Sequence, residues 1–162
     1  MIMRDIIELS AQIGGIYSKN PIINFVYKLR KKKMFKEVVK RIEMLPEIPS
    51  DEDIINFTSM YPVINGMDID GDVSFITYNK HKLCSILYNW TTGMTYSIYP
   101  PDSNSDISYI VQVIGNRIEY SIKHTNHFTN KNIDHTYVKR WIGIVIKIEL
   151  RRICANLIFG GR

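Results

Sequence analysis

Apolar side chains recur at helix spacing through the first 45 residues. The first expected helix places its apolar residues at Ile2, Ile6, Leu9 and Ile13. Gly14 and Gly15 follow this run and should end the helix. Asn20 is suited to cap a second helix, because its side chain can accept a backbone hydrogen bond and Pro21 fits the first helical position. We expect the second helix to run to about Met44.

The apolar side chains of this second helix do not stay on one side. With about 100° of rotation per residue, one group points one way and consists of Ile22, Phe25, Val26 and Leu29. A second group lies on roughly the opposite side and consists of Met34, Phe35, Val38 and Ile42. The change falls at Lys31 to Lys33. The pattern predicts either two helices, or one helix whose ends pack against different things and whose basic middle lies in solvent.

Residues 46–61 begin with a proline-flanked linker and continue into a short helix. Ser50 should cap this helix, and the acids that follow it suit the positive end of the helix dipole. Ile54, Ile55, Phe57 and Met60 are its expected core face. We expect Pro62 to end it.

From about residue 72 the apolar period changes to two, which is typical of β-strands. We expect strands over residues 73–78, 83–90, 94–99, 108–114 and 117–123. Gly115 and Asn116 form a good two-residue hairpin turn, because both residues tolerate a positive φ. Residues 124–136 are polar and predict a loop.

The final segment is ambiguous between strand and helix. Ile142, Ile144, Ile146, Ile148 and Leu150 alternate with other residues, and β-branching adds to the preference for a strand. A strand is therefore our first interpretation, and a helix over residues 138–159 is the alternative.

These elements predict an α+β fold with N-terminal helices packed on one face of a five- to seven-stranded antiparallel sheet. The length of 162 residues suits a single domain over residues 1–162. Within it, residues 1–45 form a basic helical part, residues 46–72 an acidic linker and short helix, and residues 73–162 the sheet.

Charge divides the chain into the same three blocks. Residues 1–45 have a net charge of +6, residues 46–72 of −7 and residues 73–162 of +6. Such asymmetry predicts that the acidic block folds over a basic block, or that each block faces its own partner. We expect a cytoplasmic, reducing location, because charged residues interrupt the first apolar stretch, no apolar span is visible, and Cys84 and Cys154 resemble buried thiols.

The strongest candidate for binding is a run of cations between residues 28 and 41. It contains Lys28, Arg30, Lys31, Lys32, Lys33, Lys36, Lys40 and Arg41, opposed only by Glu37. A cationic helix binds phosphates by releasing counterions, and it equally suits an acidic protein surface or an anionic membrane. The alternatives are a solvated face, or a face that the chain's own acidic block neutralises.

Two further sets of residues have weak metal-site patterns. His124, His127 and His135 lie near Asp134, and three histidines could ligate a metal ion, but their spacing in a loop is not distinctive. The segment from Asp68 to Asp72 is similar to a calcium loop, yet its glycine comes too early, so we interpret it as an acidic turn. We expect no metal and no cofactor.

Arg117, Glu119 and Lys123 should share one face of a strand, with His124 beyond them on the other. Helices followed by an antiparallel sheet that bears Glu, Arg and His resemble, in layout only, metal-independent ribonucleases such as barnase and the RelE-like toxins. In those enzymes a base removes the 2′-hydroxyl proton and cations stabilise the transition state. No motif matches residue by residue, so we assign no catalytic residue here.

Aromatic side chains are frequent in the expected sheet, at Phe75, Tyr78, Tyr88, Trp90, Tyr96, Tyr99, Tyr109 and Tyr120. Cross-strand packing accounts for most of them, and those left on the surface suit an interface. The sequence therefore favours a small non-enzymatic binding protein of accessory, inhibitor or immunity type. Its many Ile, Asn, Lys and Tyr residues have AT-rich codons, which suits a viral, phage or mobile-element gene. It would occupy an acidic protein surface through the basic helix and the sheet aromatics. The alternatives are a sequence-nonspecific nucleic-acid-binding protein and a ribonuclease-type toxin.

Overall fold

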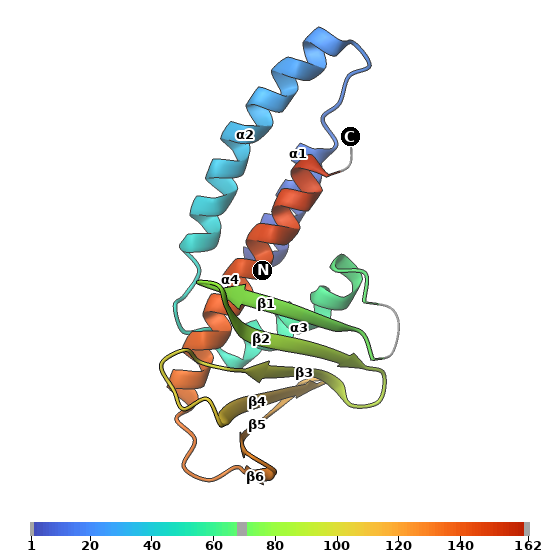
Figure 1. Ribbon diagram of the computed structural model, residues 1–162. Helices are drawn as coiled ribbons and strands as arrows, with labels where there is room; N and C mark the ends of the chain where they lie inside the picture. Colours follow the sequence, from blue (N-terminus) through green and yellow to red (C-terminus); the bar gives the residue numbers. More distant parts are fainter. Residues whose placement is uncertain (1, 68–70, 161–162) are drawn as a thin grey trace. The chain divides into compact units, whose positions relative to one another are not determined.

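The computed structural model describes residues 2–67 and 71–160, and it shows the α+β fold that the sequence predicts. Three N-terminal helices precede a six-stranded antiparallel sheet, and a C-terminal helix packs against the helices and the sheet (Figure 1). The helices are α1 (Ile2–Gly14), α2 (Pro21–Glu43), α3 (Asp51–Ile64) and α4 (His135–Phe159). The strands are β1 (Val73–Tyr78), β2 (His81–Asn89), β3 (Gly93–Ile98), β4 (Ile107–Ile114), β5 (Arg117–His124) and β6 (His127–Thr129).

The contacts divide the chain into two compact units. The first unit contains residues 1–45 and 147–162, and the second contains residues 46–146. The helix α4 contributes its first half to the second unit and its second half to the first. That the chain forms one domain stays a prediction.

The first unit is a set of packed helix segments. α1 approaches the end of α4 so closely that a Cβ atom on Gly14 would overlap the backbone carbonyl of Leu157. Phe35 of α2 packs edge-on against Phe159, with 5.4 Å between the ring centres. The C-terminal end of α2 is held by two cations of α4, because Lys147 donates to the Glu43 carbonyl and Arg151 pairs with the Glu43 carboxylate. Cations at this position also suit the negative end of the α2 dipole.

α2 is one unbroken helix, as the second sequence interpretation predicts (Figure 1). The rest of that interpretation is wrong, because the apolar group at the N-terminal end is exposed and Lys31 in the basic middle is buried. Asn20 caps it as predicted, and its side chain accepts from the backbone N–H groups of Ile22 and Ile23. Its buried residues are Lys31, near the middle of the helix, and Val38 and Ile42 beyond it. The apolar group at the N-terminal end has no such burial.

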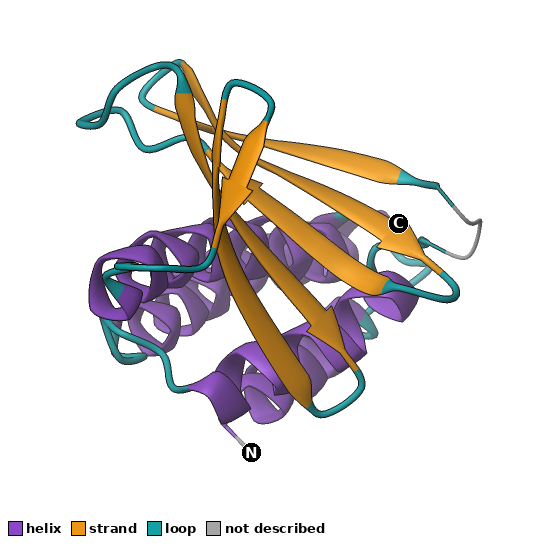
Figure 2. Cartoon of the chain, turned by 90° about the horizontal axis from the view of Figure 1, so that it is seen from below, coloured by secondary structure: helices purple, strands orange, loops and turns teal. Residues whose placement is uncertain are grey.

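The second unit is built on a meander in which each strand pairs with the next along the chain (Figure 2). Gly115 has a φ of +57° in the tight turn between β4 and β5, as the sequence predicts. Ile86, Tyr96 and Val111 are neighbours across β2, β3 and β4, and all three are fully buried. They share the face on which α3 packs, since the Tyr96 hydroxyl bonds Thr58 of α3 at 2.6 Å.

α3 begins at the predicted cap but ends later than predicted. Ser50 and Asp53 form a reciprocal capping box. Pro62 does not end the helix, which continues to Ile64. A proline near a helix end removes a single N–H donor from the last turn, and this turn keeps the bond from the Asn65 N–H to the Tyr61 carbonyl.

The strand predicted at the C-terminus is wrong, because residues 135–159 form the helix α4. Its buried side chains recur at helix spacing, at Val138, Ile142, Val145, Ile146, Glu149, Leu150, Ile153, Cys154 and Ile158. The alternation of isoleucines led to the strand interpretation. Val145 and Ile153 argue against it, because they are apolar at positions where a half-buried strand needs polar residues. Buried Glu149 pairs with Arg152 one turn later, a contact that only a helix provides.

The polar segment 124–136 contains one element that the sequence did not predict. The short strand β6 pairs with β5 and adds a sixth strand to the sheet. All three of its side chains are exposed, so it lacks the alternation by which strands are recognised.

Both cysteines are buried thiols that form no disulfide, as predicted. Cys84 lies on β2, and Cys154 lies on the second half of α4. Burial raises the pKa of the Cys154 thiol, although a hydrogen bond with Ser10 acts in the opposite direction. Among the described residues, no helix combines the length and the apolar character needed to cross a membrane.

The close approach of α1 to α4 generates a test of the first unit. We expect Gly14→Ala to lower the free energy of unfolding by about 1–3 kcal/mol, because a methyl group cannot fit beside a backbone carbonyl. Gly15→Ala is the matched control, since its Cβ atom would have no neighbour closer than 3.4 Å. Urea denaturation of both variants measures the difference, and equal midpoints would contradict the packing described.

Candidate interaction surface

Seven of the eight predicted cations lie exposed on α2. They are Lys28, Arg30, Lys32, Lys33, Lys36, Lys40 and Arg41. Lys31 differs, because its side chain is buried and donates to the Gly14 carbonyl at the end of α1, with 3.3 Å between the two atoms. This cation stabilises the C-terminal end of a helix and is not presented to a partner.

The geometry of α2 explains which cations face outward. Lys31, Val38 and Ile42 are buried and lie within about 40° of one another around the helix axis. Lys33, Lys36 and Lys40 lie on the opposite side. The Lys40 ammonium pairs with Glu37 at 3.2 Å, but both side chains are about 70% exposed, so water screens the pair and little charge is neutralised.

The same outward side carries an apolar stripe at the start of the helix. Its side chains are exposed to the extent of 77% for Ile22, 61% for Phe25, 42% for Val26 and 48% for Leu29. Sequence reasoning identified this group as a packing stripe and did not assign it to the site. The signal that could have found it was the change of side at Lys31 to Lys33, which left one of the two stripes without a core.

The N-terminal end of α2 has its backbone donors satisfied by its own chain. Pro21 has no N–H group. Those of Ile22 and Ile23 bond the Asn20 side chain at 3.0 and 3.3 Å. The N–H of Asn24 bonds the Asn20 carbonyl at 2.9 Å. The first turn therefore does not depend on water for these bonds.

The acidic block pairs with cations of α4 in the second unit. Asp51 lies 3.0 Å from the Lys139 ammonium, and Glu47 lies 3.2 Å from the Arg140 guanidinium. Asp53 is used in the cap of α3. Glu47 and Asp51 therefore pair with the C-terminal basic block. Residues 68–70 of the proposed acidic turn lie outside the described residues, whereas the backbones of Gly71 and Asp72 are hydrogen-bonded to that of Tyr88.

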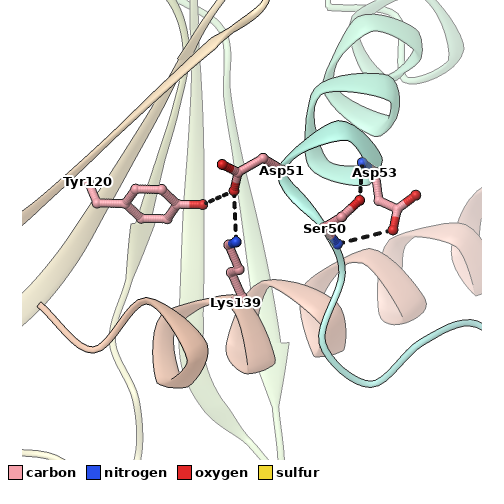
Figure 3. A network of polar contacts seen from close by, with 5 residues as sticks. All are labelled: Ser50, Asp51, Asp53, Tyr120 and Lys139. Carbon is pink, nitrogen blue, oxygen red and sulfur yellow. Dashed lines mark hydrogen bonds and ion pairs between the residues drawn. The ribbon is translucent and has the colours of Figure 1, made fainter.

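Asp51 is the centre of a small polar network (Figure 3). Its Oδ1 accepts from the Tyr120 hydroxyl at 2.8 Å as well as from Lys139. Burial acts to raise the pKa of Asp51, but these two donors and the Lys139 charge outweigh it, so the pKa lies below its ordinary value. Burial and the neighbouring carboxylate raise the pKa of Tyr120 well above its usual range. The network fastens α3 to β5 and α4.

The histidines of the polar segment have separate surroundings. His124 and His127 face each other across the β5–β6 hairpin, while His135 stacks on the Tyr120 ring at 4.5 Å. Asp134 accepts from the Tyr137 backbone N–H and so caps α4. Within residues 2–67 and 71–160, no group of three or more His, Cys, Asp or Glu side chains is placed to hold a metal ion.

The residues considered for ribonuclease chemistry lie along β5. Arg117 pairs with Glu119 at 3.4 Å, and the Lys123 ammonium lies 5.7 Å from the centre of the Phe128 ring. Glu119 also lines a polar depression of about 420 Å³ with Gln112, Ser121 and Asn130. The strand register places Glu119 and Lys123 on one face, as the sequence predicts.

Most of the predicted sheet aromatics are packing residues. Tyr96 is fully buried, Tyr78 packs edge-on against Trp141, and Tyr109 packs edge-on against Tyr137. Phe75 and Trp90 are exposed. The Lys82 ammonium lies 4.8 Å from the centre of the Phe75 ring, so this aromatic already contacts a cation.

Comparisons of the chain with protein-family models, with curated proteins and with solved structures gave no match.

The Asp51 network generates a prediction about pH. We expect Asp51→Asn to lower the free energy of unfolding by about 1 kcal/mol at pH 7, a modest loss because the Asp51 side chain is half exposed. The Asp51 pKa is lower in the folded state. Its contribution is therefore complete above the unfolded carboxyl pKa of about 3.9 and is lost as the pH falls through the folded value. The deficit of the variant should therefore be smaller at pH 3 than at pH 7.

Glu52→Gln is the matched control for Asp51→Asn. Glu52 lies in the same first turn of α3 and is exposed. Its substitution removes the same charge near the helix dipole without breaking the network. Urea denaturation at both pH values should show little change for Glu52→Gln, and an equal loss in the two variants would contradict the role given to the network.

Proposed function

We propose that this protein is a non-enzymatic binding protein that occupies the surface of an anionic partner with the exposed cations of α2. The observation that carries the proposal is seven exposed cations within residues 28–41, where Glu37 is the only acid. An accessory, inhibitor or immunity-type role fits this mode of action. Long-range attraction between such a surface and an anionic partner accelerates their association.

The acidic block supports the proposal through its own pairing. Glu47 and Asp51 already have cationic partners on α4. On the basic segment of α2, Lys40 pairs with Glu37, and both side chains of this pair are exposed to solvent. The segment therefore keeps a high positive charge density in solution, and an anionic partner would release the counterions that it collects.

The sheet offers a second point of contact. Phe75 and Trp90 expose large apolar surfaces, and aromatic side chains of this kind anchor interfaces. An acidic protein surface is the first candidate partner class, because its carboxylates would pair with the cations of α2. Nonspecific nucleic-acid binding is the second candidate, and the density of cations between residues 28 and 41 favours it through counterion release.

Charge reversal on the outward face tests the proposal. We expect the protein to bind fluorescent poly-L-glutamate, used as a stand-in for an acidic protein surface, at low salt. Affinity should fall as salt rises, and Lys33→Glu with Lys36→Glu should weaken it by roughly tenfold or more. Fluorescence anisotropy against salt concentration provides the measurement.

Lys80→Glu with Lys131→Glu is the matched control, since both residues are exposed cations of the second unit. It changes the net charge equally and should leave the affinity close to that of the wild type. Equal losses in the two double variants, or no binding at low salt, would refute the proposal. A single-stranded oligonucleotide measured in parallel decides between the partner classes, because stronger binding to it than to poly-L-glutamate would favour the nucleic-acid alternative.

A further inference from the structure

We propose that the outward side of α2 docks on an anionic membrane surface, with its apolar stripe in the interfacial layer and its cations on the lipid phosphates. This inference rests on the proposed function and names the partner more closely. The apolar stripe is Ile22, Phe25, Val26 and Leu29, and the outward cations are Lys33, Lys36 and Lys40. Both groups lie on the side of the helix opposite to its buried residues.

The order of the two groups along the helix matches the layering of a bilayer. The stripe spans Ile22 to Leu29, about 10 Å of helix at about 1.5 Å per residue. The outward cations follow it on the same side, over the next three turns. An anionic bilayer presents apolar chains directly below charged headgroups, and interfacial helices enter this boundary to a depth of roughly 5–10 Å. A slightly tilted α2 would match both layers at once.

The N-terminal end of α2 can leave water with little cost from unpaired backbone N–H groups. Transfer of an unpaired backbone N–H to an apolar medium is costly, and exposed helix ends usually carry several. In α2 the Asn20 side chain accepts from Ile22 and Ile23, and the Asn20 carbonyl accepts from Asn24. Pro21 has no N–H to satisfy. Asn20 therefore removes the main cost of moving this turn toward lipid.

The composition of the segment favours a lipid surface over the other anionic partners. No carboxylate occurs between Glu8 and Glu37, so the segment carries charge of one sign only. Protein interfaces are depleted in lysine, and leucine and valine are under-represented among their strongest contacts. Nucleic-acid phosphates offer no counterpart to the apolar stripe. Interfacial helices combine lysine and arginine with phenylalanine and leucine, and α2 has the same residue types, although here the two groups follow each other along one side and do not occupy opposite faces.

Vesicle sedimentation with the full-length protein tests the inference. The probes are vesicles of phosphatidylcholine alone, and vesicles of phosphatidylcholine and phosphatidylserine in equal amounts. We expect binding to the anionic vesicles at about 100 mM salt and much weaker binding to the neutral ones. Phe25→Ser with Leu29→Ser should weaken binding to anionic vesicles by roughly 100-fold. Lys33→Glu with Lys36→Glu should weaken it by roughly 30-fold or more.

Val63→Ser with Phe128→Ser is the control for the apolar stripe, because both residues are exposed and lie in the second unit. It should bind anionic vesicles as the wild type does. Circular dichroism of each variant confirms that the helices persist. Vesicle binding that does not respond to Phe25→Ser with Leu29→Ser would overturn the inference, since the apolar stripe would then have no part in docking.

The serine variant separates this inference from the proposed function. It keeps every cation of α2, so its binding to poly-L-glutamate should match that of the wild type. If the wild type binds poly-L-glutamate but not anionic vesicles, the membrane inference is wrong and the proposed function stands. If it binds neither, both fail.

Discussion

The fully buried positions of α2 begin only at Lys31, near the middle of the helix, and the proposed interaction surface depends on this constraint. Lys31, Val38 and Ile42 are the residues that this helix buries. The turns before Lys31 are therefore stabilised mainly by local contacts, through the Asn20 cap and Pro21 at the first position. Because packing does not fix the identity of the outward side chains there, the apolar residues at those positions are free to serve a contact with another surface.

Local signals in the sequence were sufficient for much of the fold. Asn20 and Ser50 mark helix starts by short-range hydrogen bonding, and the Gly115 turn defines a hairpin whose strands follow directly in the chain. The end of the chain was harder, because an apolar run with few polar interruptions satisfies both periods. Glu149 is buried because it pairs with Arg152. An acid at this position of an apolar helix face could not be expected from the pattern of apolar residues alone.

The site was predictable to the extent that it depends on charge along the chain. The cations of α2 stand out in the sequence, but the separate role of Lys31 depends on the end of α1 lying beside it. The apolar stripe was visible as a pattern in the sequence. Its exposure could not be predicted, because it depends on which other elements pack on α2. The pairing of Asp51 with Tyr120 and Lys139 joins residues far apart in the chain, so it could not be derived from spacing.

The placement of the two buried thiols allows the local opening of each unit to be measured separately. Cys84 is buried in the second unit and Cys154 in the first, so each unit contains its own internal thiol. A thiol reagent reaches such a group only when the surrounding structure opens, and the rate of modification reports the free energy of that opening. Matched rates at the two sulfur atoms would indicate that the chain opens cooperatively, whereas unequal rates would reveal a unit that opens while the other stays closed.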